Sequence, residues 1–158
     1  YMRVEFVEQV LKATENLPKN ITIKIHPGES TEFYHKHISD QNISVTDSNL
    51  VDELVAADLV LTVDSNVGIE GILCEAASVY LNFWFDRSNI FVEDPRIPRL
   101  ETEIEVEEFF QNISKKDISE LQAQQAEYIR TEYILEDTAD SITNYIQTDI
   151  GMRSDYRG

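Results

Sequence analysis

The stretch "DLVLTVDSNVGIEGILCEAASVYLNFW" (residues 58–84) decides the fold, because it combines a strand, a helix and a second strand in succession. Residues 58–63 are almost wholly apolar, which is typical of a strand that is covered on both faces. Residues 67–76 have a helical pattern, and residues 78–84 again have the pattern of a strand. This order predicts a right-handed βαβ unit and hence a parallel sheet.

The same alternation extends toward both ends of the chain. Upstream, we expect a helix at 2–16, a strand at 21–25, a short helical piece at 31–38, a strand at 43–46 and a helix at 50–57. Downstream, we expect a loop at 85–99 and then helices at 103–113, 116–132 and 136–148.

These elements predict the fold class and the domain organisation. We expect a single α/β domain over residues 1–150, with a Rossmann-like parallel sheet, helices on both faces and additional C-terminal helices. Residues 151–158 are expected to form a flexible tail, and the opening on a helical pattern favours a fragment of a longer protein.

Composition restricts the partners. Hydrophobic residues make up 42% of the 158 residues, which is enough for a folded core. The 13 Lys and Arg against 30 Asp and Glu give a net charge of −17, and such a field repels nucleic acid and anionic membrane surfaces. We therefore expect no nucleic-acid partner. A phosphorylated ligand would need local compensation from helix N-termini or from a few basic side chains.

The cysteine and histidine content points to a cytoplasmic protein without a metal site. Cys74 is the only cysteine, so no internal disulfide forms, and no secretion signal or long apolar run is visible. Cys74 is expected to be a core residue rather than a nucleophile. The three histidines, His26, His35 and His37, lack the accompanying carboxylate or cysteine spacing of a metal centre.

Ligands of open parallel sheets bind beyond the carboxyl ends of the strands. In this sequence all four expected strand ends carry polar or aromatic residues. They are His26–Glu29, Thr46–Asn49, Asp64–Asn66 and Phe83–Asp86.

The segment "DSNVGIE" (64–70) predicts a phosphate-binding helix start. Ser65 is well placed as an N-cap, which would leave the following backbone N–H groups unpaired, and the helix dipole would favour an anion there. Gly68 has no side chain to block a ligand, and the Glu70 carboxylate could accept hydrogen bonds from a ribose or sugar diol. The alternative is an ordinary capped helix with a solvent-facing glutamate.

The segment "KIHPGE" (24–29) ends the first expected strand. Because His26 precedes Pro27, it is restricted to extended geometry, and its imidazole could donate to a phosphate oxygen. The alternatives are a half-buried histidine bonded to a loop carbonyl and, for Glu29, either a pair with His26 or simple solvation. Pro27 and Gly28 complete this candidate wall of the site.

Other familiar sites are missing from the sequence. There is no G-x-G-x-x-G after the first strand and no G-x-x-x-x-G-K-[ST], which argues against a dinucleotide dehydrogenase and a P-loop protein. Ser65 also lacks the G-x-S-x-G context of hydrolases.

Taken in order, "IKIHPGE" (23–29) and "LVDELVAADLVLTVDSNVGIEGILCEAASVYLN" (50–82) resemble the C-terminal nucleotide-binding lobe of GT-B glycosyltransferases. The resemblance is to the cell-surface polymer group, which includes CDP-glycerol glycerophosphotransferases, capsule polysaccharide enzymes and polysialyltransferase-like proteins. In chain order, its motifs match Lys24, His26 and Pro27, then Leu54–Asp58, and then Ser65, Asn66 and Glu70. The chain departs from the group at Glu75-Ala76-Ala77, where Gly-x-Pro is usual.

The resemblance implies a transferase that uses a nucleotide-activated sugar or CDP-glycerol as donor and needs no cofactor. His26 and Ser65 would contact the donor phosphates and Glu70 the ribose. An N-terminal lobe outside this chain would supply the acceptor site and often the catalytic base, so no catalytic residue is assigned here, and the full protein could associate peripherally with a membrane. Two alternatives stay open: the lobe of a UDP-sugar 2-epimerase, and a non-catalytic, flavodoxin-like regulatory or partner-binding module.

Overall fold

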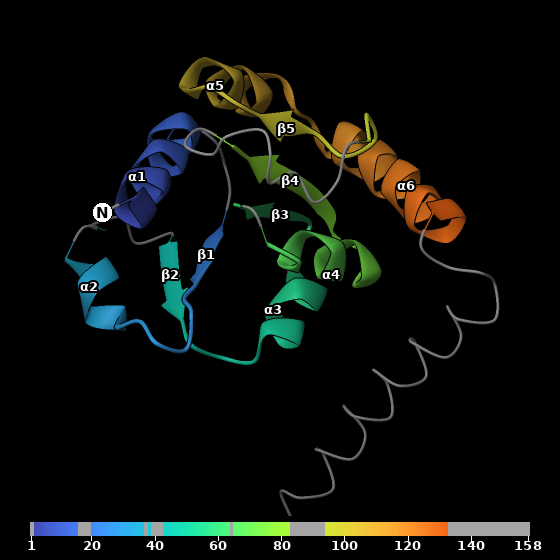
Figure 1. Cartoon of the computed structure of the whole chain (residues 1–158). Helices are drawn as coiled ribbons and strands as arrows, with labels where there is room; N and C mark the ends of the chain where they lie inside the picture. Colours follow the sequence, from blue (N-terminus) through green and yellow to red (C-terminus); the bar gives the residue numbers. More distant parts are fainter. Residues whose placement is uncertain are drawn as a thin grey trace, which may run out of the picture.

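The computed structural model describes residues 2–15, 20–36, 38, 43–63, 65–82 and 94–132 (Figure 1). Helices and short strands alternate through the first half of this range, and two longer helices close it. In chain order the elements are α1 (Met2–Thr14), β1 (Ile21–Lys24), α2 (Thr31–His35), β2 (Ile43–Thr46), α3 (Leu50–Ala56), β3 (Leu59–Thr62), α4 (Val67–Leu73), β4 (Ala77–Leu81), β5 (Arg99–Leu100), α5 (Glu103–Asn112) and α6 (Lys115–Glu132).

All strand pairs in the described residues are parallel, so the predicted α/β class is confirmed. β1 pairs with β2 in one sheet, and β3, β4 and β5 form a second sheet in that order. The four expected strands match β1 to β4 within a few residues at each end. The prediction that residues 85–99 form a loop is wrong at residue 99, because Arg99–Leu100 forms β5 beside Tyr80–Leu81.

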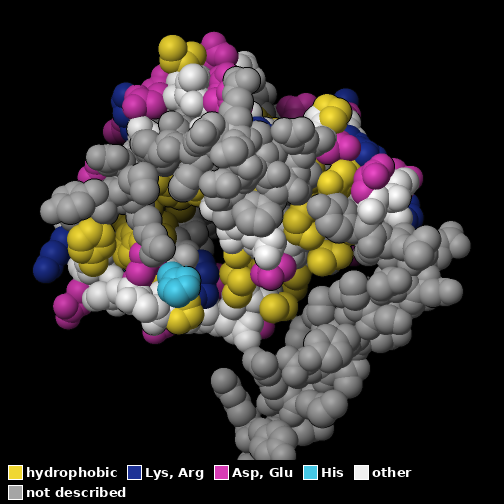
Figure 2. Space-filling model, in the orientation of Figure 1, with side chains coloured by type: hydrophobic (Ala, Val, Ile, Leu, Met, Phe, Trp, Pro, Cys, Tyr) yellow, Lys and Arg dark blue, Asp and Glu magenta, His cyan; other side chains and the backbone are white. Residues whose placement is uncertain are grey.

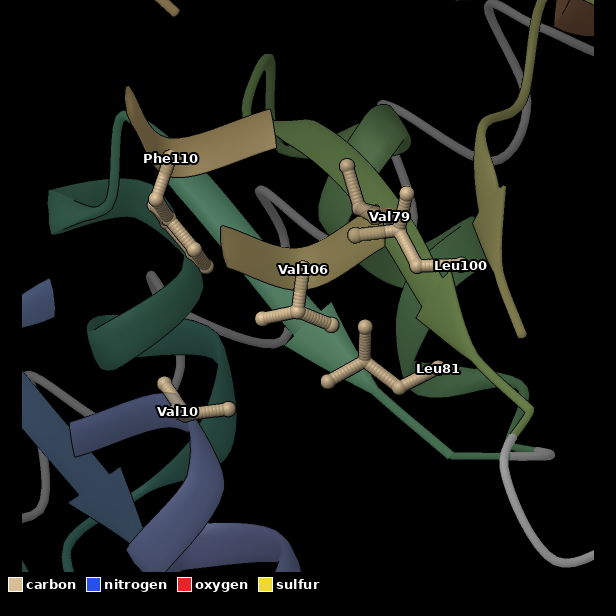
Figure 3. Close-up of a cluster of buried hydrophobic side chains, with 6 residues drawn as sticks. All are labelled: Val10, Val79, Leu81, Leu100, Val106 and Phe110. Carbon is tan, nitrogen blue, oxygen red and sulfur yellow. The ribbon is translucent and has the colours of Figure 1, made fainter. Parts of the chain in front are cut away.

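Helices cover both faces of the β3–β4–β5 sheet, as the sequence predicted. On one face Val79 and Leu81 of β4 pack with Val10 of α1 and with Val106 and Phe110 of α5 (Figure 3). On the other face Tyr80 packs with Ile72 of α4 and with Tyr128 and Ile129 of α6. The apolar run of β4 thus reflects burial on both sides, since all five of its residues are buried.

Helix α1 connects the two sheets by packing alone. Val10 belongs to the apolar cluster on β4, whereas Val7 belongs to a second cluster with Ile25 and Tyr34 near the β1–β2 sheet. Phe6 packs against both clusters. A single amphipathic helix therefore ties the small sheet to the larger one.

Helix α4 ends earlier than predicted, at Leu73 rather than at residue 76. Glu75 adopts a positive φ of 68°, its N–H donates to the Ile72 carbonyl, and the Ala76 N–H donates to the Gly71 carbonyl. These two bonds form a Schellman motif, which normally places glycine at the left-handed position. The chain turns there and enters β4 directly.

Some predictions concern residues outside the described ranges. These are the helix at 136–148, the tail at 151–158, and the strand-end residues Asp64 and Phe83–Asp86. Among the described residues, none of the helices has the length and apolarity that a membrane-spanning segment requires.

Candidate functional site

The turn between β3 and α4 holds its backbone by internal hydrogen bonds. The Ser65 hydroxyl accepts from the Val67 N–H at 3.2 Å, and the Ser65 carbonyl accepts from the Gly68 N–H at 3.3 Å. The N-cap position is taken by Asn66, one residue later than predicted. The expectation of unpaired N–H groups directly after Ser65 is therefore wrong for Val67 and Gly68.

Gly68 faces the protein interior. A Cβ atom at this position would lie 2.4 Å from the Tyr80 hydroxyl oxygen and 2.5 Å from its Cζ atom. The sequence suggested that the absence of a side chain at Gly68 leaves room for a ligand. In the direction that a Cβ atom would take, this expectation is wrong, because Tyr80 fills that space. The Tyr80 hydroxyl in turn donates to the Ser65 carbonyl at 3.0 Å and anchors the turn to β4.

Asn66 and Glu70 are the exposed polar side chains of this turn and of the first turn of α4. The Asn66 side chain makes no capping hydrogen bond. Its amide is therefore not used to satisfy the helix start, and both groups lie at the surface beyond the carboxyl end of β3. The predicted contacts of Ser65, Asn66 and Glu70 with a ligand stay predictions.

The turn "KIHPGE" is closed by hydrogen bonds around His26, which is exposed rather than half-buried. The Glu29 carboxylate accepts from the His26 backbone N–H at 2.9 Å, so Glu29 is not simply solvated. The Gly28 N–H donates to His26 Nδ1 at 3.3 Å. In the neutral imidazole this bond favours a proton on Nε2, which then serves as a hydrogen-bond donor.

The end of β2 is used mainly to start α3. Asn49 caps that helix by accepting from the Val51 N–H at 2.9 Å, and the Ser48 hydroxyl donates to Glu53 Oε1 at 2.5 Å. The Thr46 hydroxyl accepts from the Ser48 N–H at 3.0 Å. These polar residues, which the sequence offered as site candidates, thus have local structural roles.

The sheet pairing decides which strand ends lie together. The Ile25 N–H donates to the Thr46 carbonyl at 3.1 Å, so the turn at His26 lies beside residues 47–49. Ser65 lies with the end of β4, whose Tyr80 reaches its carbonyl. Among the described residues, no hydrogen bond joins His26 to Ser65. The two residues could therefore act together only by contacting the same bound ligand.

Cys74 is a partly buried residue at the end of α4, His35 is an exposed residue of α2, and His37 lies outside the described residues. Cys74 packs at the edge of an apolar cluster, and burial, followed by the negative charge of Glu70, raises the pKa of its thiol. A raised thiol pKa disfavours the reactive thiolate. In the described ranges no group of three or more His, Cys, Asp or Glu residues could hold a metal ion.

Comparison with known proteins assigns neither a family nor a function to this chain. No protein-family model, no curated protein and no solved structure matches this chain. The function must therefore be inferred from the chemistry of the two turns, at Lys24–Glu29 and at Ser65–Glu70.

Proposed function

We propose that this chain is the donor-nucleotide-binding lobe of a GT-B glycosyltransferase or glycerophosphotransferase in cell-surface polysaccharide synthesis. The observation that carries the proposal is the pair of hydrogen-bonded turns beyond the ends of β1 and β3. Each presents exposed polar side chains, His26 in one and Asn66 with Glu70 in the other. Ligands of open parallel sheets bind at this edge.

The finer fold that the proposal requires is a single Rossmann-like sheet in the order β2-β1-β3-β4-β5. Two features support it: every described strand pair is parallel, and Phe6 of α1 packs against clusters on both sheets. In this order β1 and β3 are neighbours. Their following turns would then form opposite walls of one crevice.

The proposed chemistry divides between the two walls. His26 Nε2 donates to a donor phosphate, while the Asn66 amide and the Glu70 carboxylate bond to sugar or ribose hydroxyls. Ser65, Pro27, Gly28 and Gly68 shape the backbone of the walls. The donor is a nucleotide-activated sugar or CDP-glycerol, no cofactor is required, and acceptor binding and the catalytic base come from a second lobe.

The test is a titration of the protein with CDP, UDP and CMP, each alone and linked to its sugar or glycerol group, followed by NMR. We expect shifts at His26, Asn66 and Glu70, and a loss of affinity of about tenfold for His26→Ala, since a charge-assisted hydrogen bond is removed. His35→Ala is the matched control, because His35 is an exposed histidine on α2.

Two outcomes would argue against the proposal. If no nucleotide binds at millimolar concentration, the donor-lobe function fails and a partner-binding module becomes the better reading. If His35→Ala weakens binding as much as His26→Ala, the site lies elsewhere on the chain.

A further inference from the structure

A buried hydroxyl group of β4 holds the turn between β3 and α4 from beneath. The Tyr80 hydroxyl donates to the Ser65 carbonyl at 3.0 Å, although Tyr80 is only 5% exposed. The Tyr80 ring packs with Ile72 of α4 and Tyr128 of α6. The ring therefore lies inside an apolar cluster, while its hydroxyl reaches the backbone of the turn.

A second hydroxyl on the same face of β4 binds the same segment. Side chains two residues apart on a strand share a face, so Ser78 lies on the side of Tyr80. Ser78 is fully buried, and its Oγ donates to the Gly68 carbonyl at 2.7 Å. Gln125 of α6 binds both the N–H and the carbonyl of Ser78 and so fixes its backbone. The turn is thus held to the core at two carbonyls, those of Ser65 and Gly68.

The bond from Tyr80 is not needed to satisfy the Ser65 carbonyl. That carbonyl also accepts from the Gly68 N–H at 3.3 Å. Tyr80→Phe would keep the ring in the apolar cluster and would leave the carbonyl with its Gly68 bond, whereas the buried hydroxyl carries a desolvation cost. The hydroxyl therefore adds modestly to the stability of the fold, and its main effect is on the geometry of the turn.

The turn and the first turn of α4 carry the exposed polar side chains of the proposed donor site. Asn66 is exposed and its side chain makes no capping hydrogen bond, and Glu70 is exposed four residues further along. In Figure 2 the side chains in view over α3 and α4 are mostly hydrophobic, with an acidic side chain among them. Because few polar groups are available at this surface, recognition of a ligand there depends on where Asn66 and Glu70 are held.

We infer that Tyr80 is a positioning residue of the candidate site. Its hydroxyl holds the Ser65 carbonyl, and this fixes the direction in which Asn66, the next residue, presents its amide. The buried phenol acts through the turn rather than by contact with the ligand. The inference rests on the proposed function for the ligand itself, a nucleotide donor. The hydrogen bond belongs to the protein alone, so its effect on the turn can be measured without a ligand.

The first measurement is amide hydrogen exchange at Gly68, followed by NMR on the intact chain. Tyr80→Phe should speed this exchange by about three- to tenfold, the factor that corresponds to the loss of one hydrogen bond. Tyr128→Phe is the matched control, because Tyr128 is buried in the same apolar cluster but lies on α6. Thermal unfolding checks that each variant is folded. Ser78→Ala removes the other hydroxyl bond to this segment and provides the test if Tyr80→Phe unfolds.

The second measurement is nucleotide affinity, by titration with CDP, UDP and CMP and their sugar- or glycerol-linked forms. Tyr80→Phe should weaken binding about fivefold. A double-mutant cycle with Asn66→Ala separates positioning from a general loosening of the core. If Tyr80 acts through Asn66, the loss in the double variant is smaller than the product of the two single losses, whereas independent effects multiply.

The outcomes separate this inference from the proposed function. Faster exchange at Gly68 in Tyr80→Phe but not in Tyr128→Phe, with no nucleotide binding to any variant, supports the positioning of the turn and contradicts the donor lobe. Nucleotide binding that Tyr80→Phe leaves unchanged overturns the inference and keeps the function. Unchanged exchange at Gly68, losses that multiply with Asn66→Ala, or equal effects of Tyr128→Phe would each overturn it as well.

Discussion

At the scale of single residues, the side-chain amide of Gln125 on α6 binds the backbone of Ser78 in β4. Gln125 is fully buried; its Oε1 accepts from the Ser78 N–H at 2.7 Å, and its Nε2 donates to the Ser78 carbonyl at 2.7 Å. In the parallel register of β4 with β5, the residue that would donate its backbone N–H to the Ser78 carbonyl is Pro98. Proline has no backbone N–H and cannot make this bond. Gln125 therefore takes the place of a neighbouring strand.

We expect Gln125→Met to lower the free energy of unfolding by about 3 kcal/mol, because two buried backbone groups lose their partners at about 1–3 kcal/mol each. Urea denaturation measures the change. Gln122→Met is the control on the same helix, since the Asp58 carbonyl that Gln122 binds also accepts from the Ala77 N–H. Equal losses for the two variants would contradict the role assigned to Gln125.

Glu75 carries a conformational cost that the sequence did not reveal. Its φ of 68° lies in the left-handed region, where glycine is favoured. Glu75→Gly should raise the free energy of unfolding by about 0.5–1 kcal/mol, after allowance for the greater freedom of glycine in the unfolded chain. Thermal and urea unfolding test this. Glu75→Ala removes the charge but keeps a Cβ, so an equal gain there would show that charge, not conformation, is responsible.

At the scale of elements, short segments are held by specific side chains. Glycines at positions 68 and 71 let α4 approach β4, since a Cβ at Gly71 would lie 2.8 Å from the Ser78 hydroxyl.

The turn before β5 is fastened to α6 by Arg96, which donates to both carboxylate oxygens of Asp94 at 2.8 Å and lies 4.8 Å from the centre of the Tyr128 ring.

The pairing of Asp94 with Arg96 predicts a pH dependence. Hydrogen bonds from Arg96 lower the pKa of Asp94 from 3.8 to about 2. Because the folded-state pKa is depressed, the stabilisation is present above about pH 4 and is lost as the pH falls from 3.8 toward 2. The Tm difference between the wild-type protein and Asp94→Asn should therefore shrink over that interval.

Glu120→Gln on α6 is the control for this pH series, because its ion pair with Lys116 joins two exposed side chains. Exposed pairs of this spacing contribute little, so its Tm should stay close to that of the wild type throughout. A gap for Asp94→Asn that stays constant down to pH 2 would contradict the assigned coupling.

At the scale of the whole molecule, charge opposes folding. A net charge of −17 on 158 residues produces self-repulsion in the compact state, and added salt screens it. We expect the Tm to rise by a few degrees between 10 and 300 mM KCl, since about 1 kcal/mol corresponds to roughly 2–4 °C in a domain of this size.

Sucrose at matched osmolality controls for non-ionic effects in the salt series. A Tm that is flat or falls with KCl would mean that attractive pairs, such as Arg96 with Asp94, outweigh the repulsion.

The sequence by itself determined the order and type of most elements. Apolar runs bounded by turn residues identified β1 to β4, and the helical pattern at 103–113 identified α5, because these signals are local and come from burial periodicity. The two-residue strand β5 has no such signal. It exists only because Arg99–Leu100 meets β4, so it could not be predicted from composition.

The tertiary structure decided what the candidate site residues face. The sequence identified the turns at His26 and Ser65, but Gly68 proved to admit Tyr80, and the Ser65 hydroxyl proved to bind the backbone of its own turn. The contact of Gly68 with Tyr80 joins residues far apart in the chain, and local sequence patterns do not encode such contacts.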